Sequence, residues 1–172
     1  AFPFGASQEI ELGYARVRAT RMSYVGELGW ELYIPSEFAL GVYDVIAEAG
    51  ESHGLVMAGY HALNSLRIEK AFRHWGHEIS DEISPIEGGL GWTVKLNKET
   101  DFIGKNVLQQ QKEAPNPRRV IHFISREKRI ARQGCPILAD GEVIGKVLSG
   151  TFSPITGRAI GSAIVELDKA KN

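Results

Sequence analysis

The stretch KEAPNP at residues 112–117 places two prolines and an asparagine close together, a composition that interrupts both helices and strands. Before this stretch, segments with helical spacing alternate with segments with strand spacing. After it, only strand spacing is found. We therefore predict an α+β chain of two lobes: a mixed lobe over residues 1–114, and a small β-barrel or sandwich over residues 118–172 that ends before all its edges are paired.

The first lobe is predicted to begin with two or three strands, because apolar and polar residues alternate through residues 9–35. Ser36 is predicted to cap a helix that ends near Gly50. A short buried strand is expected at residues 55–58, a helix at 60–72, a strand at 92–96 and a short helix through residue 111. The apolar stripe of the first helix consists of Phe38, Leu40, Val42, Tyr43, Ile46 and Ala47.

The second lobe is predicted to contain four strands, at residues 120–125, 136–138, 143–148 and 159–165. Pairs ending in glycine, at residues 140–141, 149–150 and 156–157, are expected to form the turns between or beside these strands.

The charge balance excludes a strongly basic or acidic binding surface as the main feature. Lys and Arg total 20 and Asp and Glu total 21 in 172 residues, so nothing global favours nucleic acid or an anionic membrane as a partner.

Cys135 is the one cysteine, which excludes an intrachain disulfide and suits a reducing compartment. Since no signal peptide or apolar span is found, we expect a soluble protein of the cytoplasm, or of the mitochondrial matrix in a eukaryote. The missing initiator Met favours a fragment of a longer enzyme.

The segment SYVGELGWELY, at residues 23–33, is the strongest candidate for a binding site. Gly26 and Gly29 permit positive φ or a close approach to a ligand, and Glu31 stands among apolar neighbours, where a carboxylate needs hydrogen-bond donors. This pattern is typical of a turn that delivers Tyr24 and Glu31 to a pocket for a donor-rich ligand. A plain β-hairpin with a solvent-facing Glu31 fits the residues equally well.

Three other clusters favour structural roles. His74 and His77 offer too few ligands for a metal, and no metal site is predicted. Glu87, in a glycine-rich turn, is expected to anchor backbone amides or to fix Arg67 or Arg73. Cys135 is interpreted as a buried or incidental thiol, because no positive charge stands beside it in sequence.

Five motifs in order resemble the folate-binding aminomethyltransferase family, the T-protein of the glycine cleavage system and its relatives. They are YVGELGWE at 24–31, SLRIEK at 65–70, SPIEGGLGW at 84–92, DFIGK at 101–105 and DGEVIGKVLSG at 140–150. The sequence EKAFRHWG at 69–76 is most similar to the tetrahydrofolate domain that follows the flavin domain in dimethylglycine and sarcosine dehydrogenases.

The resemblance implies a T-protein-like folate-binding lobe, present in part, and transfer of a one-carbon unit from an amine to N5 of tetrahydrofolate, which gives 5,10-methylenetetrahydrofolate. It places the family's pterin-contacting residues on Tyr24 and Glu31. It places the catalytic aspartate in an N-terminal half outside this chain, so we expect no catalytic residue here and little activity of the fragment alone. FAD would belong to an upstream domain, and a lipoyl carrier protein would be a partner in the T-protein type.

The sequence departs from the family pattern at one folate-contacting position, so other functions are also considered. Leu63 stands where the T-protein has a folate-contacting arginine, and Arg67 matches a different family position. A non-catalytic scaffold that docks a partner and binds no folate therefore remains as a second hypothesis. A third, a folate-dependent iron–sulfur assembly factor, would require a reactive cysteine motif that Cys135 does not resemble.

Overall fold

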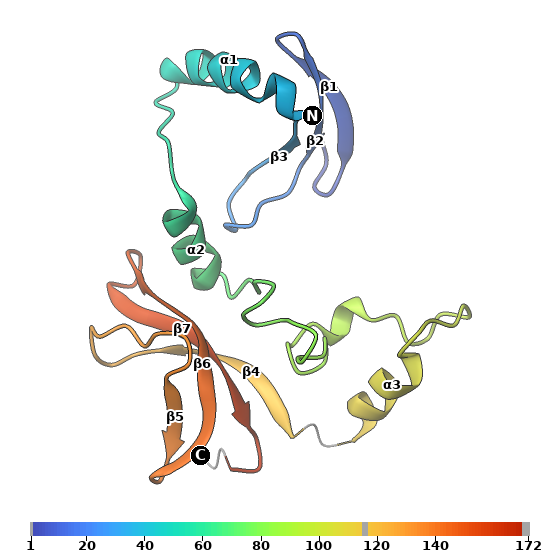
Figure 1. The fold of residues 1–172 in the computed structure, drawn as a ribbon, viewed down its shortest axis with the longest axis vertical. Helices are drawn as coiled ribbons and strands as arrows, with labels where there is room; N and C mark the ends of the chain where they lie inside the picture. The colour runs from blue at the N-terminus through green and yellow to red at the C-terminus, as the bar shows by residue number, and fades with distance from the viewer. Residues whose placement is uncertain (1, 115–116, 170–172) are drawn as a thin grey trace. The chain divides into compact units, whose positions relative to one another are not determined.

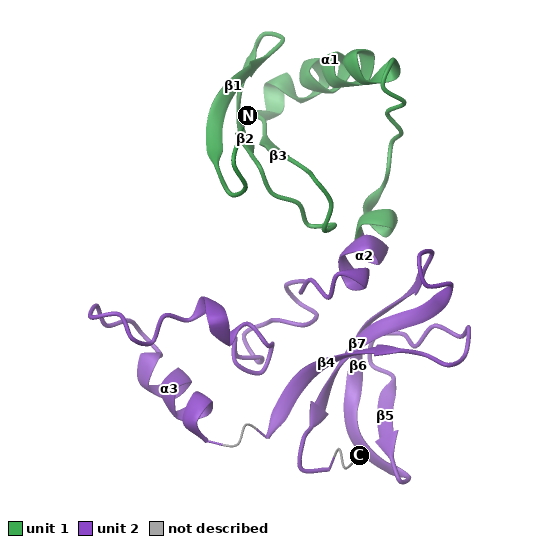
Figure 2. Ribbon diagram, turned by 180° about the vertical axis from the view of Figure 1, so that it is seen from behind, with its two compact units in different colours: residues 1–63 green, residues 64–172 purple. Residues whose placement is uncertain are grey.

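The structure, a computed structural model, describes residues 2–114 and 117–169 (Figure 1). Pro115 and Asn116 of the predicted linker lie outside the described residues. The chain forms two compact units, residues 1–63 and 64–172, which divide within helix α2 (Tyr60–Glu69) (Figure 2). The predicted lobes, at 1–114 and 118–172, have different limits from these units and stay a prediction.

The first unit contains a three-stranded antiparallel sheet and one long helix. Strands β1 (Ser7–Leu12), β2 (Ala15–Thr20) and β3 (Glu31–Tyr33) lie in the order β1-β2-β3, and α1 (Ala39–Glu51) follows a short 3₁₀ turn, η1 (Ser36–Phe38). The strict alternation of β2 buries Ala15, Val17 and Ala19 and exposes Arg16 and Arg18. Ala15 and Val17 pack with Val42 of α1 to form the core of this unit.

Two expectations for the first unit are wrong. The Ser36 side chain makes no capping hydrogen bond, since η1 continues directly into α1. Residues 55–58 form no strand, and Leu55, Val56 and Met57 are 45%, 81% and 61% exposed. The helical stripe is also narrower than predicted: Val42 is buried, whereas Leu40 and Tyr43 are exposed.

The second unit is built on a four-stranded antiparallel sheet with the order β4-β7-β6-β5. Its strands are β4 (Arg118–Ile124), β5 (Pro136–Ala139), β6 (Glu142–Ser153) and β7 (Arg158–Glu166). These positions confirm the four predicted C-terminal strands. Residues 149–150, expected as a turn, lie instead inside β6, where Gly150 approaches the Ala131 carbonyl so closely that a Cβ would stand 1.8 Å from it.

The packing of this sheet depends on apolar positions of β4, β6 and β7. Val120, Leu148 and Ile164 form one buried cluster, to which Ile83 adds. The pairing of β5 with β6 is irregular between Ile137 and Leu138.

Two short elements precede the sheet. Helix α3 (Lys105–Glu113) confirms the predicted short helix, whereas the strand predicted at 92–96 is wrong, because η2 (Gly91–Thr93) and turns occupy that segment. The mixed α+β class is confirmed. No helix in the described part of the chain is long and apolar enough to cross a membrane.

Candidate functional site

Glu31 is the first residue of β3 and lies on the polar face of the first sheet. Its register partner is Thr20, and Tyr33 faces Arg18, so these side chains share the face opposite the Val17 core. Glu31 is half-buried, and its Oε2 accepts a hydrogen bond of 3.1 Å from the Tyr33 hydroxyl. This hydrogen bond, together with the negative charge of Glu31, raises the pKa of Tyr33 above its ordinary value. The carboxylate is thus partly shielded and retains capacity to accept further hydrogen bonds.

Tyr24 lies in the loop that connects β2 to β3 and is half-buried. The loop begins with a local contact in which the Val25 backbone N–H donates to Ser23 Oγ over 3.2 Å. Gly26 adopts a positive φ of 75°, and a Cβ on Gly29 would stand 2.9 Å from Ser23 Cβ, so both glycines are required by this loop. Tyr24 and Glu31 therefore occupy the two ends of one tightly turned segment, and their role in folate binding stays a prediction.

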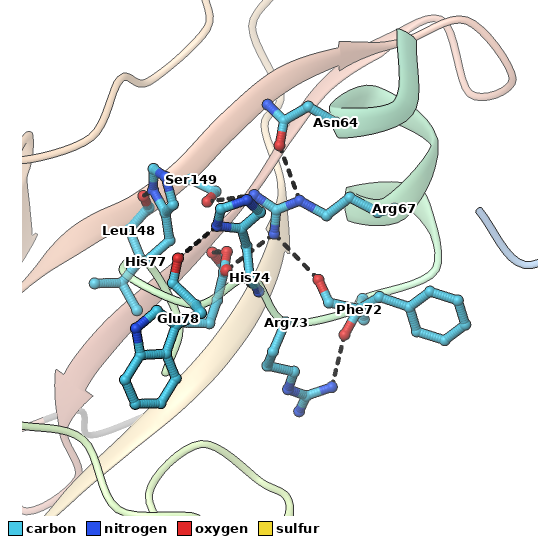
Figure 3. Close-up of polar contacts among 12 residues, drawn as sticks. Asn64, Arg67, Phe72, Arg73, His74, His77, Glu78, Leu148 and Ser149 are labelled. Atoms are coloured by element: carbon cyan, nitrogen blue, oxygen red, sulfur yellow. Dashed lines mark hydrogen bonds and ion pairs between the residues drawn. The ribbon is translucent and has the colours of Figure 1, made fainter. Parts of the chain in front are cut away.

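The second unit contains a buried ion pair that was not foreseen from the sequence. Arg67 and Glu78 are each 1% exposed, and Arg67 Nη1 lies 2.9 Å from Glu78 Oε2. Figure 3 shows Arg67 extending from α2 toward Ser149 of β6, whose Oγ accepts from Nη2 over 2.8 Å. Arg67 also donates to Asn64 Oδ1 and to the Phe72 carbonyl. One guanidinium thus joins α2, the following loop and the sheet.

Glu78 is held ionised by its surroundings. Burial by itself would raise its pKa, but hydrogen bonds from Ser162, Ser149 and the His74 backbone N–H, together with the charge of Arg67, lower the pKa below its ordinary value. Ser162 Oγ donates to Oε1, and His74 N–H donates to Oε2 over 2.9 Å. The sequence showed Glu78 beside two histidines, and the backbone N–H of one of them, His74, is a partner. The side-chain partners Arg67 and Ser162 are 11 and 84 residues away along the chain.

Glu87 anchors a backbone amide, as predicted, but its arginine partner is different. Its carboxylate accepts from Ser84 N–H and from Arg118 Nε, each over 2.9 Å, so the expectation that it fixes Arg67 or Arg73 is wrong. Arg73 instead donates to the carbonyls of Gly88 and Ala71. The Glu87 carbonyl accepts from the Val120 backbone N–H, which ties this turn to β4.

The remaining candidate residues are the His74 and His77 pair and Cys135. The His74 and His77 rings meet edge to face with centroids 4.8 Å apart, and His77 Nδ1 lies 3.2 Å from the Leu148 carbonyl. Within residues 2–114 and 117–169, no group of three or more His, Cys, Asp or Glu could hold a metal ion. Cys135 is exposed, which removes the buried alternative for this thiol.

Family models match nearly the whole sequence. The GCVT N-terminal domain matches residues 1–98, and the glycine cleavage T-protein C-terminal barrel domain matches residues 118–172. An aminomethyltransferase of Geobacillus kaustophilus is 40% identical over 98% of this chain and 46% of its own length. The mitochondrial sarcosine dehydrogenase of Homo sapiens is 41% identical over 88% of this chain and 17% of its own length.

The fold is matched as well. A crystal structure of the glycine cleavage system aminomethyltransferase T from Bartonella henselae superposes with a TM-score of 0.85 at 24% identity, over 96% of this chain and 45% of the other. The chain therefore spans a little under half the length of the aminomethyltransferases that it matches.

Proposed function

Because this chain belongs to the glycine cleavage T-protein family, we propose that it is part of a tetrahydrofolate-dependent one-carbon transferase. The reaction moves a one-carbon unit from an amine to N5 of tetrahydrofolate and yields 5,10-methylenetetrahydrofolate. Aminomethyltransferases and sarcosine dehydrogenases stand among its relatives, so the amine is presented either by a lipoyl carrier protein or by a flavin-containing part of the same polypeptide. FAD, in the second case, lies outside this chain.

The observation that carries the proposal is the placement of Glu31. A reduced pterin presents its 2-amino group and N3–H as a flat pair of donors, and a carboxylate accepts such a pair with both oxygens. Glu31 has the required chemistry: it is half-buried, and Tyr33 engages one of its oxygens from the same strand. Glu31 would bind the pterin edge, and Tyr24, from the adjoining loop, would contact the ring.

The residues of this chain have binding and positioning roles in the proposal. The resemblance places the family's catalytic aspartate outside this chain, so Tyr24 and Glu31 would orient the pterin and take no part in proton transfer. We accordingly expect turnover from the natural polypeptide that contains the chain and little or none from the chain alone.

Replacing Glu31 with Gln tests the proposal. The substitution keeps the shape but turns one acceptor into a donor that faces a donor. The expected loss is about 2–4 kcal/mol of binding free energy, or ~30- to 1000-fold in Kd. The measurement is a calorimetric titration of the natural polypeptide with a reduced folate.

Glu11→Gln is the matched control. Glu11 pairs with Arg16 across β1 and β2, lies on the same polar face of the sheet and is exposed, so its substitution makes the same change of charge without touching the loop. Equal folate affinity in wild type and Glu31→Gln would reject the assignment. Equal losses in both variants would point to a general charge effect instead.

A scaffold without folate binding is the second candidate, and Leu63 is the observation that favours it. Leu63 lies in α2 and is half-buried, and it cannot donate a hydrogen bond where the T-protein arginine does. A natural polypeptide that shows no affinity for reduced folate and forms no 5,10-methylenetetrahydrofolate from sarcosine, dimethylglycine or an aminomethyl-lipoyl carrier would establish this candidate over the transferase.

A further inference from the structure

The second unit contains a cavity of about 420 Å³ beside the end of α2. Its wall is mainly apolar and includes Ile68, Phe123, Ile124, Ile155 and Ile160. This volume lies within the range of small-molecule sites, which combine apolar walls with a few polar groups. The cavity can therefore accommodate a compact organic molecule.

Glu69 provides the polar group of this cavity. Its Oε1 accepts from Ser153 Oγ and, over 3.4 Å, from the Ile155 backbone N–H. Its Oε2 is shielded from water and accepts no hydrogen bond from the described residues. A buried carboxylate oxygen without a hydrogen bond destabilises the folded state, and a ligand that donates a hydrogen bond to it would remove this cost. The terminal torsion of a glutamate is soft, so rotation about it can turn Oε2 toward a donor in the cavity.

Three ionisable residues line the cavity in the described part of the chain, and Glu69 is the acidic one. His122 lines the cavity from β4, and partial desolvation, followed by the positive charge of Arg73, lowers its pKa and so disfavours the charged ring. Lys70 is exposed at the rim. A carboxylate ligand would meet the Glu69 charge, whereas an ammonium group would form a charge-assisted hydrogen bond with it.

We propose that this cavity binds a small primary amine with a compact apolar body. The ammonium group donates to Glu69, and the body lies against Phe123 and the surrounding isoleucines. The residues of its wall belong to the second unit, whereas Tyr24 and Glu31 belong to the first, and the inference does not depend on the folate proposal.

Benzylamine tests this proposal, with benzyl alcohol and benzoate as probes of similar shape. Each is titrated into the natural polypeptide at pH 7 and followed by calorimetry. We expect benzylamine to bind about 10-fold or more tightly than benzoate. Glu69→Gln should weaken benzylamine by about 10- to 100-fold and benzyl alcohol by far less, because only the ammonium depends on the carboxylate charge.

Two further variants keep the test decisive. Glu127→Gln, at an exposed position outside the cavity, should leave all three affinities unchanged. Ile155→Trp fills the cavity from an exposed position and should abolish binding of the amine and the alcohol without unfolding the chain. Absence of benzylamine binding, whether the cavity is unsuited or filled by another part of the polypeptide, overturns the proposal. So do equal affinities in wild type and Glu69→Gln, or equal affinities for amine and benzoate.

Discussion

At the scale of single residues, the buried Arg67–Glu78 pair has the largest expected effect on stability. Arg67→Met leaves Glu78 buried, 1% exposed and without its cation. Breaking a buried pair in this way costs about 3–5 kcal/mol, since the remaining buried charge has lost its counter-charge. We expect that loss in the free energy of unfolding, measured with urea at pH 7.

Arg18→Met is the comparison for this prediction. Arg18 forms an ion pair with Glu9 at 3.4 Å, and the two side chains are 53% and 54% exposed. Solvent screens such a pair, so its loss should cost about 1 kcal/mol or less. Similar losses in the two variants would contradict the importance assigned to burial.

The pH dependence of stability follows from Glu78. Its pKa in the folded state lies below the ordinary value of 4.5, because hydrogen bonds and Arg67 outweigh the opposite effect of burial. The unfolded state then binds the proton more tightly than the folded state. The stabilisation is fully present above the unfolded pKa and is lost as the pH falls through the folded value. We expect the free energy of unfolding to fall below about pH 4.5, and to fall less steeply in Glu78→Gln. Parallel curves for the two proteins would exclude this assignment.

The sequence predicted the neighbours of individual residues only where they are local. Glu87 was expected to anchor a backbone amide, and Ser84, three residues away, provides it. Its partner Arg118 is 31 residues away and is brought there by β4, which no local pattern could reveal. Glu78 was missed for the same reason, since Ser162 is 84 residues distant.

At the scale of elements, most segments were predicted correctly and two short ones were not. Two or three strands were expected within residues 9–35, where the structure has three, and helices α1, α2 and α3 and the four C-terminal strands were expected near their observed positions. Residues 55–58 are a short apolar run, and residues 92–96 alternate apolar and polar residues over only five positions. Patterns this short do not separate a strand from a loop, so both were expected as strands and neither is one.

Two glycines are expected to respond in opposite directions to alanine. A Cβ on Gly145 in β6 would stand 2.1 Å from the Ile164 carbonyl of β7, so Gly145→Ala should cost at least ~2 kcal/mol by forcing the strands apart. Gly41 lies in α1 with open space around its Cβ position, and Gly41→Ala should stabilise by about 0.5–1 kcal/mol. Thermal unfolding of both variants provides the measurement, and a shift of the same sign in both would refute this account.

At the scale of the whole molecule, the connection between α1 and α2 is the expected site of proteolysis. Leu55, Val56 and Met57 are exposed, and residues 55–59 belong to no helix or strand. Brief digestion with chymotrypsin should cut after Leu55, Met57 or Tyr60 before it cuts within β6 or β7, as mass spectrometry of the fragments would show. First cuts inside the C-terminal sheet would contradict the prediction.

The family could be predicted from the sequence because its motifs extend along almost the whole chain, from residue 24 to residue 150. The resemblance also placed Tyr24 and Glu31 as pterin contacts, whereas the residues by themselves left a plain hairpin equally open. The cavity beside Glu69 could not have been foreseen, since its wall joins α2 to strands more than 50 residues further along the chain.

The C-terminal sheet has two outer strands, β4 and β5, and each has a different feature that hinders pairing with a strand of another molecule. On β5, Pro136 lacks a backbone N–H and the pairing is irregular between Ile137 and Leu138, which makes that edge a poor template. On β4, the Val120 N–H is already engaged by the Glu87 carbonyl. Neither outer strand of this sheet offers an uninterrupted row of free amides, so the sheet should resist the addition of a foreign strand and growth into cross-β fibres from its edges.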